Sequence, residues 1–553
     1  MIWQKIRSKF TFWHLVTFLA FLFFVVFLMY PLGTILIRSI KNTGTGEWTL
    51  KNFTKFFSKS YYYGALFNSF KVTFFVTVLT AIAGSVLAYI MKTVRIRGKQ
   101  TLNMLIMISI LSPPFIGAYS WVVLLGRNGV ITKFLNDLFS VQLPGIYGFG
   151  GILMVFTLKL APLIYLYMTG AFNNVDKSLG EAAESLGAGG FKIMMKIIFP
   201  IVLPTLLASG LLVFMRAMAD FGTPMLIGEG YKTMPVLIYT EFISEVGGDD
   251  GFAAALSIIT ILITLAIFIC QKMITQRKAV SSSSMNPLDA KPYRGIRNAA
   301  AHGFCYIFVL MTIMPQLVVV VTSFLKTSGT LFKAQFSLDS YVKGLSKMGS
   351  SIANTYIYGI IAIAFIVILG VLVSYVSVKR RNFLNNLLDT VSMIPYIIPG
   401  SVLGIALLIS FNRRPLLLSG TAAIIIIAWI IRRLPYTLRS SAAILHQISP
   451  SIEEAAISLG ASGIKAFFLV TLPMMLPGVV SGALMSWLSV ITELSSSILL
   501  YTTRTRTITI SIYTEVLRGN NGTAAALSTI LTMTTIITLM IFFKISGKKE
   551  IEM

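Results

Sequence analysis

The sequence has few of the side chains that hold metals, form disulfides or carry catalytic protons. Of its 553 residues only 2 are cysteines and 3 are histidines, and charged residues make up 12%. Cys270 and Cys305 are isolated thiols, too few for a disulfide framework or a metal site. His14, His302 and His446 fall in unrelated parts of the chain. The sequence therefore predicts no metal site and no catalytic residues, which argues against a membrane enzyme.

A nucleotide site is also missing from the sequence. Gly98-Lys99 and Gly547-Lys548 lack the upstream glycine and the following Ser or Thr of a phosphate-binding loop. We therefore expect no cofactor in this chain, and any ATP-Mg must bind another polypeptide. The net charge of +26 comes without the basic, aromatic-lined groove that nucleic acids need, so no nucleic-acid partner is predicted.

Apolar residues, in contrast, are abundant. They make up 56% of the chain, and the mean hydropathy is +0.81. Apolar runs of about 20 residues, long enough to cross a hydrocarbon core of roughly 30 Å, recur along the whole length. The sequence predicts an all-α protein of the lipid bilayer with about twelve transmembrane helices, six per half. They are expected near 13–38, 65–91, 101–125, 148–171, 201–228 and 252–271, and near 302–324, 355–377, 386–411, 417–438, 472–500 and 523–543.

The placement of Lys and Arg predicts the orientation in the membrane. The tightest basic clusters, at 92–99, 272–278 and 379–381, all fall on one side of the predicted spans. Connections rich in Lys and Arg stay in the cytoplasm. We therefore expect both termini to be cytoplasmic.

One polar segment occurs twice. Residues 181–200 read EAAESLGAGGFKIMMKIIFP and residues 454–473 read EAAISLGASGIKAFFLVTLP, so the numbering of the two copies differs by 454 − 181 = 273. Both copies lie between apolar runs on the predicted cytoplasmic side. A polar segment kept in both halves of a membrane protein needs something in water to contact. An ordinary amphipathic loop lying on the bilayer is the alternative, and two copies on one side at fixed spacing argue against it.

The rest of the chain is predicted to be duplicated as well. Asn68-Ser69 and Asn354-Thr355 are predicted to open matching helices, with a numbering difference of 354 − 68 = 286. With an even number of helices per half, both halves start inside and the duplication is parallel. The segment between them is rich in Ser, Pro and charge, typical of a flexible cytoplasmic linker. The predicted domains are a first transmembrane domain (1–275), the linker (276–300) and a second transmembrane domain (301–553).

Each copy of the polar motif is predicted to form two short helices. The alanines favour helix and permit close approach to a partner, and a glycine permits reversal of the chain. The leading glutamate is expected in or near the first turn, where the helix dipole favours a carboxylate. A second amphipathic stretch should end at Pro200 or Pro473. The residues expected to contact the partner are Glu181, Ala182, Ala183 and Gly187, and Glu454, Ala455, Ala456 and Gly460.

This motif resembles the EAA-loop signature of ABC importer permeases. The resemblance implies the type I, maltose-permease-like fold, in which the loop forms a coupling helix docked on a cytosolic ATPase subunit. It implies two ATPase copies for one chain with two loops, an extracytoplasmic substrate-binding protein and no second permease chain. The localisation it implies is the bacterial cytoplasmic membrane.

Further segments resemble fused permeases of the ferric-iron importer type. They are SPPFIGAYSW (112–121), MADFGTPMLIG (218–228) and TELSSSILLY (492–501). Ferric iron, as Fe³⁺ or a small ferric complex, is the substrate that this resemblance implies. Permeases for phosphonates such as 2-aminoethylphosphonate, and for thiamine, look similar and stay open. A secondary transporter would also explain twelve duplicated helices, but it would leave the two EAA loops without a role.

Two pairs of ionisable residues lie within predicted spans, where charge is costly and commonly marks a transport pathway. Asp220 matches Glu493 and Lys159 matches Arg432, each at the same numbering difference as the two copies of the polar motif. We expect these four residues to line the pathway, where the carboxylates would favour a passing cation. In the alternative interpretation, Asp220 pairs with Arg216 one helical turn earlier, and the basic pair snorkels to a membrane interface.

Overall fold

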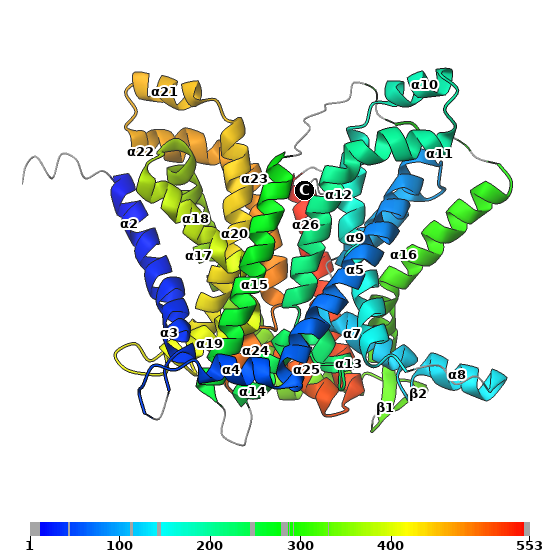
Figure 1. Ribbon diagram of the computed structural model, residues 1–553, viewed down its shortest axis with the longest axis horizontal. Helices are drawn as coiled ribbons and strands as arrows, with labels where there is room; N and C mark the ends of the chain where they lie inside the picture. Colours follow the sequence, from blue (N-terminus) through cyan, green and yellow to red (C-terminus); the bar gives the residue numbers. More distant parts are fainter. Residues whose placement is uncertain are drawn as a thin grey trace, which may run out of the picture.

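The computed structural model describes residues 12–42, 45–110, 114–140, 145–243, 249–277, 286, 288–290, 292, 294–329 and 331–546. It is an almost entirely helical bundle (Figure 1). Among the described residues, nine helices are long and apolar enough to cross a membrane, and eleven spans result if each of two bent helix pairs counts as one.

The first half of the chain contains a long series of helices. They are α2 (Phe12–Phe24), η1 (Val25–Met29), α3 (Tyr30–Ser39), α4 (Lys51–Ser58), α5 (Ser60–Thr93), α6 (Lys99–Ile110), α7 (Pro114–Leu125), α8 (Val130–Phe139), α9 (Phe149–Asn173), α10 (Lys177–Ser185), α11 (Gly190–Ile193), η2 (Met194–Ile198), α12 (Phe199–Ala219), α13 (Gly222–Ile227), α14 (Met234–Ile243) and α15 (Asp250–Arg277).

The second half contains a comparable series with a small strand pair near its start. Its elements are α16 (Ile296–Ser323), β1 (Leu325–Ser328), β2 (Leu331–Phe336), α17 (Asp339–Lys379), α18 (Phe383–Ile397), α19 (Gly400–Ser410), α20 (Ala422–Gln447), α21 (Pro450–Ser458), α22 (Gly463–Ala466), η3 (Phe467–Thr471), α23 (Leu472–Ile491), α24 (Ser497–Leu500), α25 (Ile508–Leu517) and α26 (Asn521–Ser546). Strands β1 and β2 form an antiparallel hairpin that the hydropathy pattern did not predict.

Several expected spans take a different form. The span expected over 386–411 is two helices, α18 and α19, bent by 110° at residues 398–399. The span over 101–125 is likewise divided, into α6 and α7 on either side of residues 111–113, which lie outside the described residues. The span over 417–438 is helix α20. Its three arginines (Arg432, Arg433 and Arg439) make it too polar to count among the nine helices that are apolar enough to cross a membrane. The hydropathy of a segment does not reveal where its helix bends, or whether its arginines have carboxylate partners.

The pairs Asn68-Ser69 and Asn354-Thr355 lie inside α5 and α17 and do not open these helices as predicted, because α5 begins at Ser60 and α17 at Asp339. They nevertheless have matching roles. The Ser69 hydroxyl accepts a hydrogen bond of 2.8 Å from the N–H of Met234, and the Thr355 hydroxyl accepts one of 2.7 Å from the N–H of Ile508. Each pair therefore fixes the backbone at the start of α14 or α25.

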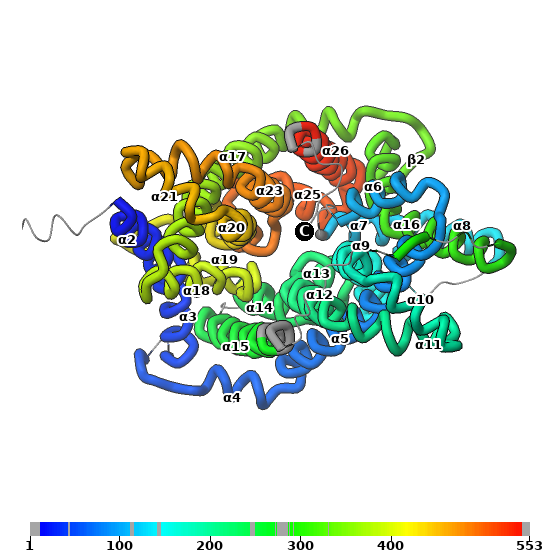
Figure 2. The backbone as a smooth tube through the Cα atoms, turned by 90° about the horizontal axis from the view of Figure 1, so that it is seen from above, coloured from blue at the N-terminus to red at the C-terminus, as the bar shows by residue number. Residues whose placement is uncertain are grey.

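The first helix of each half packs against the other half. Helices α2 and α3 contact α17, α18 and α19, while α16 contacts α5, α6, α7 and α9 (Figure 2). Trp13 on α2 lies with its ring centroid 4.2 Å from that of Tyr375 on α17. This reciprocal exchange interlocks the two halves of the chain into one bundle.

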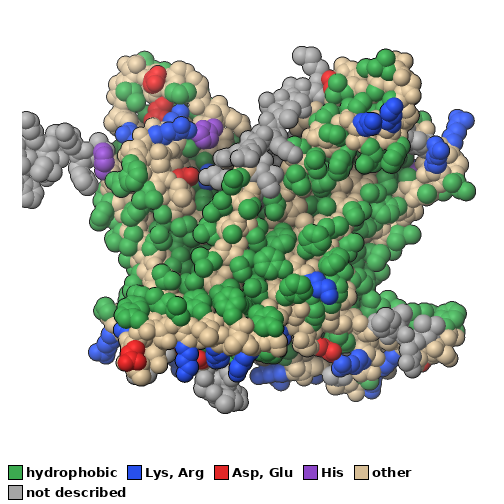
Figure 3. Space-filling model, in the orientation of Figure 1, with side chains coloured by type: hydrophobic (Ala, Val, Ile, Leu, Met, Phe, Trp, Pro, Cys, Tyr) green, Lys and Arg blue, Asp and Glu red, His purple; other side chains and the backbone are tan. Residues whose placement is uncertain are grey.

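The surface divides into three zones. A broad apolar band crosses the middle of the molecule, and charged side chains gather at both ends (Figure 3). Helices α10, α11, α21 and α22 lie at one end, and α4, α8, α14 and the β hairpin lie at the other (Figure 1). Helix α2 begins at the end that carries α10 and α21. An apolar band between two charged ends is the surface that a bilayer requires.

Candidate functional site

The first part of each copy of the polar motif lies in α10 or α21, which project from the same end of the bundle (Figure 1). Both helices are described in full, and neither has a buried residue. At the start of α10 the Asp176 carboxylate accepts a hydrogen bond of 2.9 Å from the N–H of Ser178, which lowers the pKa of Asp176. The cap stabilises the start of α10, and the lack of buried residues leaves both helices open to a partner.

Gly187 and Gly460 end these helices in the left-handed conformation, with φ of +79° and +92°. After Gly187, the N–H of Ala188 donates to the carbonyl of Ala183 at 2.9 Å. The second copy repeats this bond, from Ala461 to the carbonyl of Ala456 at 3.1 Å. This is the Schellman arrangement, in which glycine reverses the chain and the last carbonyls of the helix are satisfied. The predicted reversal at the glycines is therefore present in both copies.

The glutamates of the motif lie near the first turn of their helices, directly after it. Glu181 is the fifth residue of α10 and Glu454 the fifth of α21, so neither is in the first turn. The acidic residue in the first turn of α21 is Glu453. Its carboxylate accepts hydrogen bonds from the hydroxyls of Tyr375 and Thr471, which tie α21 to the bundle. Glu181 and Glu454 themselves are exposed.

The most exposed apolar side chains of both loops occupy matched positions. Leu186 is 89% exposed and Leu459 is 90% exposed, directly before the two reversing glycines. Three further exposed pairs follow the same spacing: Leu179 with Ile452, Phe191 with Ile464, and Met195 with Phe468. We call these eight residues the loop surface. The repeated motif shows that these positions match, but only the structure shows that their side chains are exposed.

The second part of each motif continues into a membrane helix. Gly190–Ala219 and Gly463–Ile491 are each one candidate span, with the π-helical turns η2 and η3 inside them. Pro200 and Pro473 occupy the first turn of α12 and α23, where proline is tolerated. They do not end a separate loop helix as predicted. A partner that moved the loop surface would therefore act on α12 and α23 directly.

The described part of the linker contacts the first motif. Asp289 forms an ion pair of 3.0 Å with Lys177, the first residue of α10, and the Lys177 N–H donates to the carbonyl of Asn286 at 2.9 Å. This pairing raises the pKa of Lys177 and lowers that of Asp289. Residues 278–285, 287, 291 and 293, which belong to the segment predicted as flexible, lie outside the described residues.

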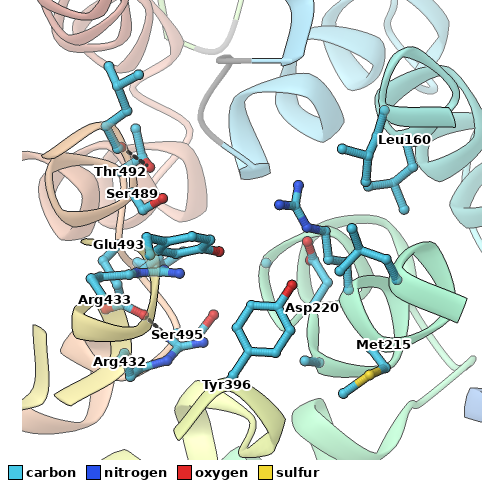
Figure 4. Close-up of a pocket in the computed structure, with 18 of the residues that line it drawn as sticks. Leu160, Met215, Asp220, Tyr396, Arg432, Arg433, Ser489, Thr492, Glu493 and Ser495 are labelled. Carbon is cyan, nitrogen blue, oxygen red and sulfur yellow. Dashed lines mark hydrogen bonds and ion pairs between the residues drawn. The ribbon is translucent and has the colours of Figure 1, made fainter. Parts of the chain in front are cut away.

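A cavity of about 260 Å³ lies between the two halves of the chain (Figure 4). Its walls come from matched helices, α9 and α12 on one side and α20 and α23 on the other, with α18 beside them. Lys159 and Arg432 are each the eleventh residue of α9 and α20. At 1.5 Å per residue they lie about 15 Å along their helices, near the middle of a bilayer of roughly 30 Å.

All four ionisable residues predicted for the pathway line this cavity, and they form two matched ion pairs. Lys159 Nζ lies 2.6 Å from Asp220 Oδ2, and Arg432 Nη1 contacts Glu493 Oε1. Both pairs join residues 61 positions apart. Asp220 thus pairs with Lys159 and not with Arg216. The basic residues have carboxylate partners inside the bundle, which differs from the snorkelling alternative.

The carboxylates are fully engaged by protein groups. Glu493, whose side chain is 1% exposed, accepts hydrogen bonds from the backbone N–H and the hydroxyl of both Ser496 and Ser497, besides its contact with Arg432. Asp220 Oδ1 accepts a bond of 2.9 Å from the N–H of Thr223. Across the described residues, no group of three or more His, Cys, Asp or Glu side chains could hold a metal ion. The carboxylates therefore serve as partners of the basic residues.

Two further arginines line the cavity, and within the described part of the chain neither forms an ion pair with a carboxylate. They are Arg216 on α12 and Arg433 on α20, which the sequence had not indicated as pathway residues. Tyr436 lies next to both, and Tyr396 packs edge-on against Tyr436 with ring centroids 6.1 Å apart. In Figure 4, Arg433 and Tyr396 extend into the space between Glu493 and Asp220. The described lining thus has four cationic side chains and two carboxylates.

Comparison with known families adds the biological context of this geometry. The sequence model of the family described as binding-protein-dependent transport system inner membrane component matches twice, at residues 81–280 and 366–549. The chain belongs to this family. It is therefore a multi-pass permease of the inner membrane, the membrane component of an ABC importer. The two matches contain the two halves of the cavity and both helices of the polar motif.

Individual relatives resemble the chain over different lengths. The ferric transport system permease protein FbpB of Actinobacillus pleuropneumoniae is 28% identical over 98% of this chain and 79% of its own length. A putative ferric transport system permease of Haemophilus influenzae is 29% identical over 90% of this chain and 79% of its own length. A putative 2-aminoethylphosphonate transport system permease protein PhnU of Salmonella typhi is 29% identical over 48% of this chain and 90% of its own length.

Proposed function

We propose that this permease imports ferric iron, as Fe³⁺ or a small ferric complex, and that one chain forms the whole translocation pathway. The observation that carries the proposal is the similarity, over 90–98% of this chain, to permeases named for ferric transport. Both halves of one cavity come from this single chain, which supports a pathway without a second permease. Among the described residues, the nine long helices, the two bent pairs and α20 would together make twelve transmembrane segments.

Energy for transport would come from two cytosolic ABC ATPase subunits, which carry the ATP-Mg, with one subunit on each of α10 and α21 as coupling helices. The exposure of both helices at one end of the bundle supports this number. An extracytoplasmic binding protein would deliver the substrate at the opposite end. With α10 and α21 in the cytoplasm, helix α2 also begins there, so the N-terminus would be cytoplasmic, and the C-terminus with it.

The test is uptake of radioactive iron into proteoliposomes that contain the permease and its ATPase, with the binding protein encoded beside the permease added outside. We expect uptake that requires both ATP and the binding protein. A purified complex should have the mass of one 60.8-kDa permease chain and two ATPase subunits. Uptake driven by an ion gradient without ATP would contradict the proposal in favour of a secondary transporter, and two permease chains per complex would contradict the one-chain pathway.

A phosphonate such as 2-aminoethylphosphonate is the second candidate substrate. The observation in its favour is the excess of cationic side chains in the cavity, which suits an anion. The relative named for this substrate covers only half of the chain, so ferric iron remains first. Uptake of 2-aminoethylphosphonate in the same proteoliposomes, with no uptake of iron, would reverse this order.

A further inference from the structure

We propose that the central cavity is an oxyanion site, in which Arg216 and Arg433 bind the negatively charged group of the substrate during its passage. The inference rests on the proposed transport function and names the substrate class of the same pathway. A ferric ion would then cross together with an anionic ligand and not as a bare cation. A phosphonate would use its own oxyanion.

The first step of the argument is the charge balance of the lining. Asp220 neutralises Lys159 and Glu493 neutralises Arg432, and both carboxylates have additional hydrogen-bond donors. Among the described lining residues, the two pairs therefore leave no free carboxylate for a passing cation. Arg216 and Arg433 remain as the excess charge, so this lining has a net positive charge of two. In a site of low dielectric the excess attracts anions and repels a bare trivalent cation.

The second step is the arrangement of the two arginines. Arg216 comes from the first half of the chain and Arg433 from the second, and Tyr436 lies next to both guanidinium groups. Two like charges beside one phenol repel each other unless an anion lies between them. Arg433 Nε is buried and has no hydrogen-bond partner among the described residues. An unsatisfied buried N–H of a charged group is costly, and an oxyanion would satisfy it.

The third step is the size and polarity of the space. About 260 Å³ is close to the lower end of ligand pockets, roughly 300 Å³, and suits a small substrate. Hydroxyl groups of Tyr396 and Ser489 add neutral donors around the arginines. The guanidinium fork matches the geometry of carboxylate and phosphate oxygens. Because the two arginines belong to different halves, an anion between them would also hold the halves together.

The experiment compares variants of the complete transporter, with ATPase and binding protein, in proteoliposomes. Probes are ⁵⁵Fe supplied with ¹⁴C-labelled citrate, and labelled 2-aminoethylphosphonate without iron. The variants are Arg216→Gln and Arg433→Gln, with Arg216→Lys and Arg433→Lys as charge-preserving partners. Arg439→Gln is the matched control, because Arg439 lies on α20 outside the cavity, where it contacts Asp389 at 3.4 Å.

We expect each glutamine variant to lower uptake about tenfold or more, since a hydrogen bond to a charged group is lost. The lysine variants keep the charge but lose the guanidinium fork, so they should retain more uptake than the glutamine variants but less than the wild type. Arg439→Gln should be unchanged. Entry of ⁵⁵Fe together with its ¹⁴C label identifies the ligand of a ferric complex as the oxyanion. Entry of 2-aminoethylphosphonate without entry of iron identifies the phosphonate group of the substrate as the oxyanion. This result would overturn the ferric proposal and support the oxyanion site.

The opposite result is equally clear. If the wild type imports ⁵⁵Fe without its ¹⁴C label, and the glutamine variants import iron as well as or better than the wild type, the oxyanion site is wrong although the ferric function is right. A loss of uptake in the lysine variants as large as in the glutamine variants, with complex assembly and ATPase activity intact, would also overturn it, because the positive charge would then contribute nothing to uptake.

Discussion

Arg432 pairs with Glu493 at the same sequence separation at which Lys159 pairs with Asp220, 61 in each case. The side chains of Arg432 and Glu493 are 12% and 1% exposed, whereas those of Lys159 and Asp220 are 20% and 11% exposed. The two halves therefore contain matching ion pairs, and the pair in the second half is the more buried one. In each half the pair joins the helix before the polar motif to the end of the helix after it.

Breaking the more buried pair should cost the most. Glu493→Gln leaves Arg432 without a counter-charge in the membrane, and we expect a loss of about 3–5 kcal/mol in the free energy of unfolding. The measurement is the Tm of the purified complex in detergent. The double variant Arg432→Met with Glu493→Met should be more stable than Glu493→Gln, because no unpaired charge remains. Asp220→Asn should cost less, and an equal or larger loss there would contradict the ranking by burial.

The matched positions of these four residues were predictable from the sequence, but the partners within each ion pair were not. The spacing of the repeated motif matched Asp220 with Glu493 and Lys159 with Arg432, because a duplication preserves spacing. Sequence spacing suggested Arg216 as the partner of Asp220, since residues four apart share a helix face. The chain leaves helix α12 at Asp220, which lets the carboxylate reach Lys159 on α9 instead. Such contacts between helices depend on helix ends, which periodicity does not define.

The fold, like the ion pairs, was predictable only in its local features. Hydropathy located the nine long spans of the described residues, because length and apolar character are local properties. It could not show the 110° bend between α18 and α19 or the exchange of α2 and α16 between the halves, which depend on tertiary packing. Arg433 and Tyr436 were not recognised as cavity residues, since a second arginine beside Arg432 gives no sign of which side chain faces the cavity.

The reversing glycines provide a test of coupling. Replacing Gly187 or Gly460 with Val should strain the backbone, because φ is +79° and +92° there, and a β-branched residue is an outlier in this region. We expect uptake and transport-linked ATP hydrolysis to fall while the membrane spans still insert. Gly189→Val is the control, since Gly189 lacks a positive φ and has open space around it. Normal coupled transport in the Gly187→Val, Gly460→Val double variant would refute the coupling-helix assignment.

The exposed leucines of the loop surface provide a test of docking. Leu186 and Leu459 are 89% and 90% exposed, and burying a leucine against a partner contributes roughly 1.5–3 kcal/mol. Changing either residue to Ser should therefore weaken ATPase binding about tenfold or more, measured by the dissociation constant of the permease–ATPase complex. Leu417→Ser is a matched control, because Leu417 is exposed between α19 and α20, away from the loop surface. Unchanged affinity in both leucine variants would place the interface elsewhere.

The contact between the linker and α10 should depend on pH. Its ion pair lowers the pKa of Asp289 and raises that of Lys177. The contribution of Asp289 is thus fully present above its unfolded pKa and is lost as the pH falls through the lowered value. That of Lys177 is lost only as the pH rises through its raised value. Both groups are exposed, so the contact is screened by salt.

Hydrogen exchange at the Lys177 amide measures this contact, because that N–H donates to the Asn286 carbonyl. At neutral pH the Asp289→Asn variant should exchange faster than the wild type. The two rates should converge in acid, once the wild-type carboxylate is protonated. Equal rates at neutral pH would show that the ion pair does not hold the linker on α10.

The last prediction concerns the space that the Arg432 side chain needs. A Cβ atom at Gly400 would lie 2.3 Å from Arg432 Nη1 and 2.7 Å from the Cβ of Ser495. Gly400→Ala should therefore push Arg432 away from Glu493 and lower both the Tm of the complex and its uptake. Gly117→Ala on α7 is the control, since a Cβ atom there would meet nothing within 4 Å among the described residues beyond its own helix. If Gly400→Ala is as stable and active as Gly117→Ala, the Arg432 side chain has room to move. The idea that the absence of a side chain at Gly400 holds Arg432 against Glu493 would then be wrong.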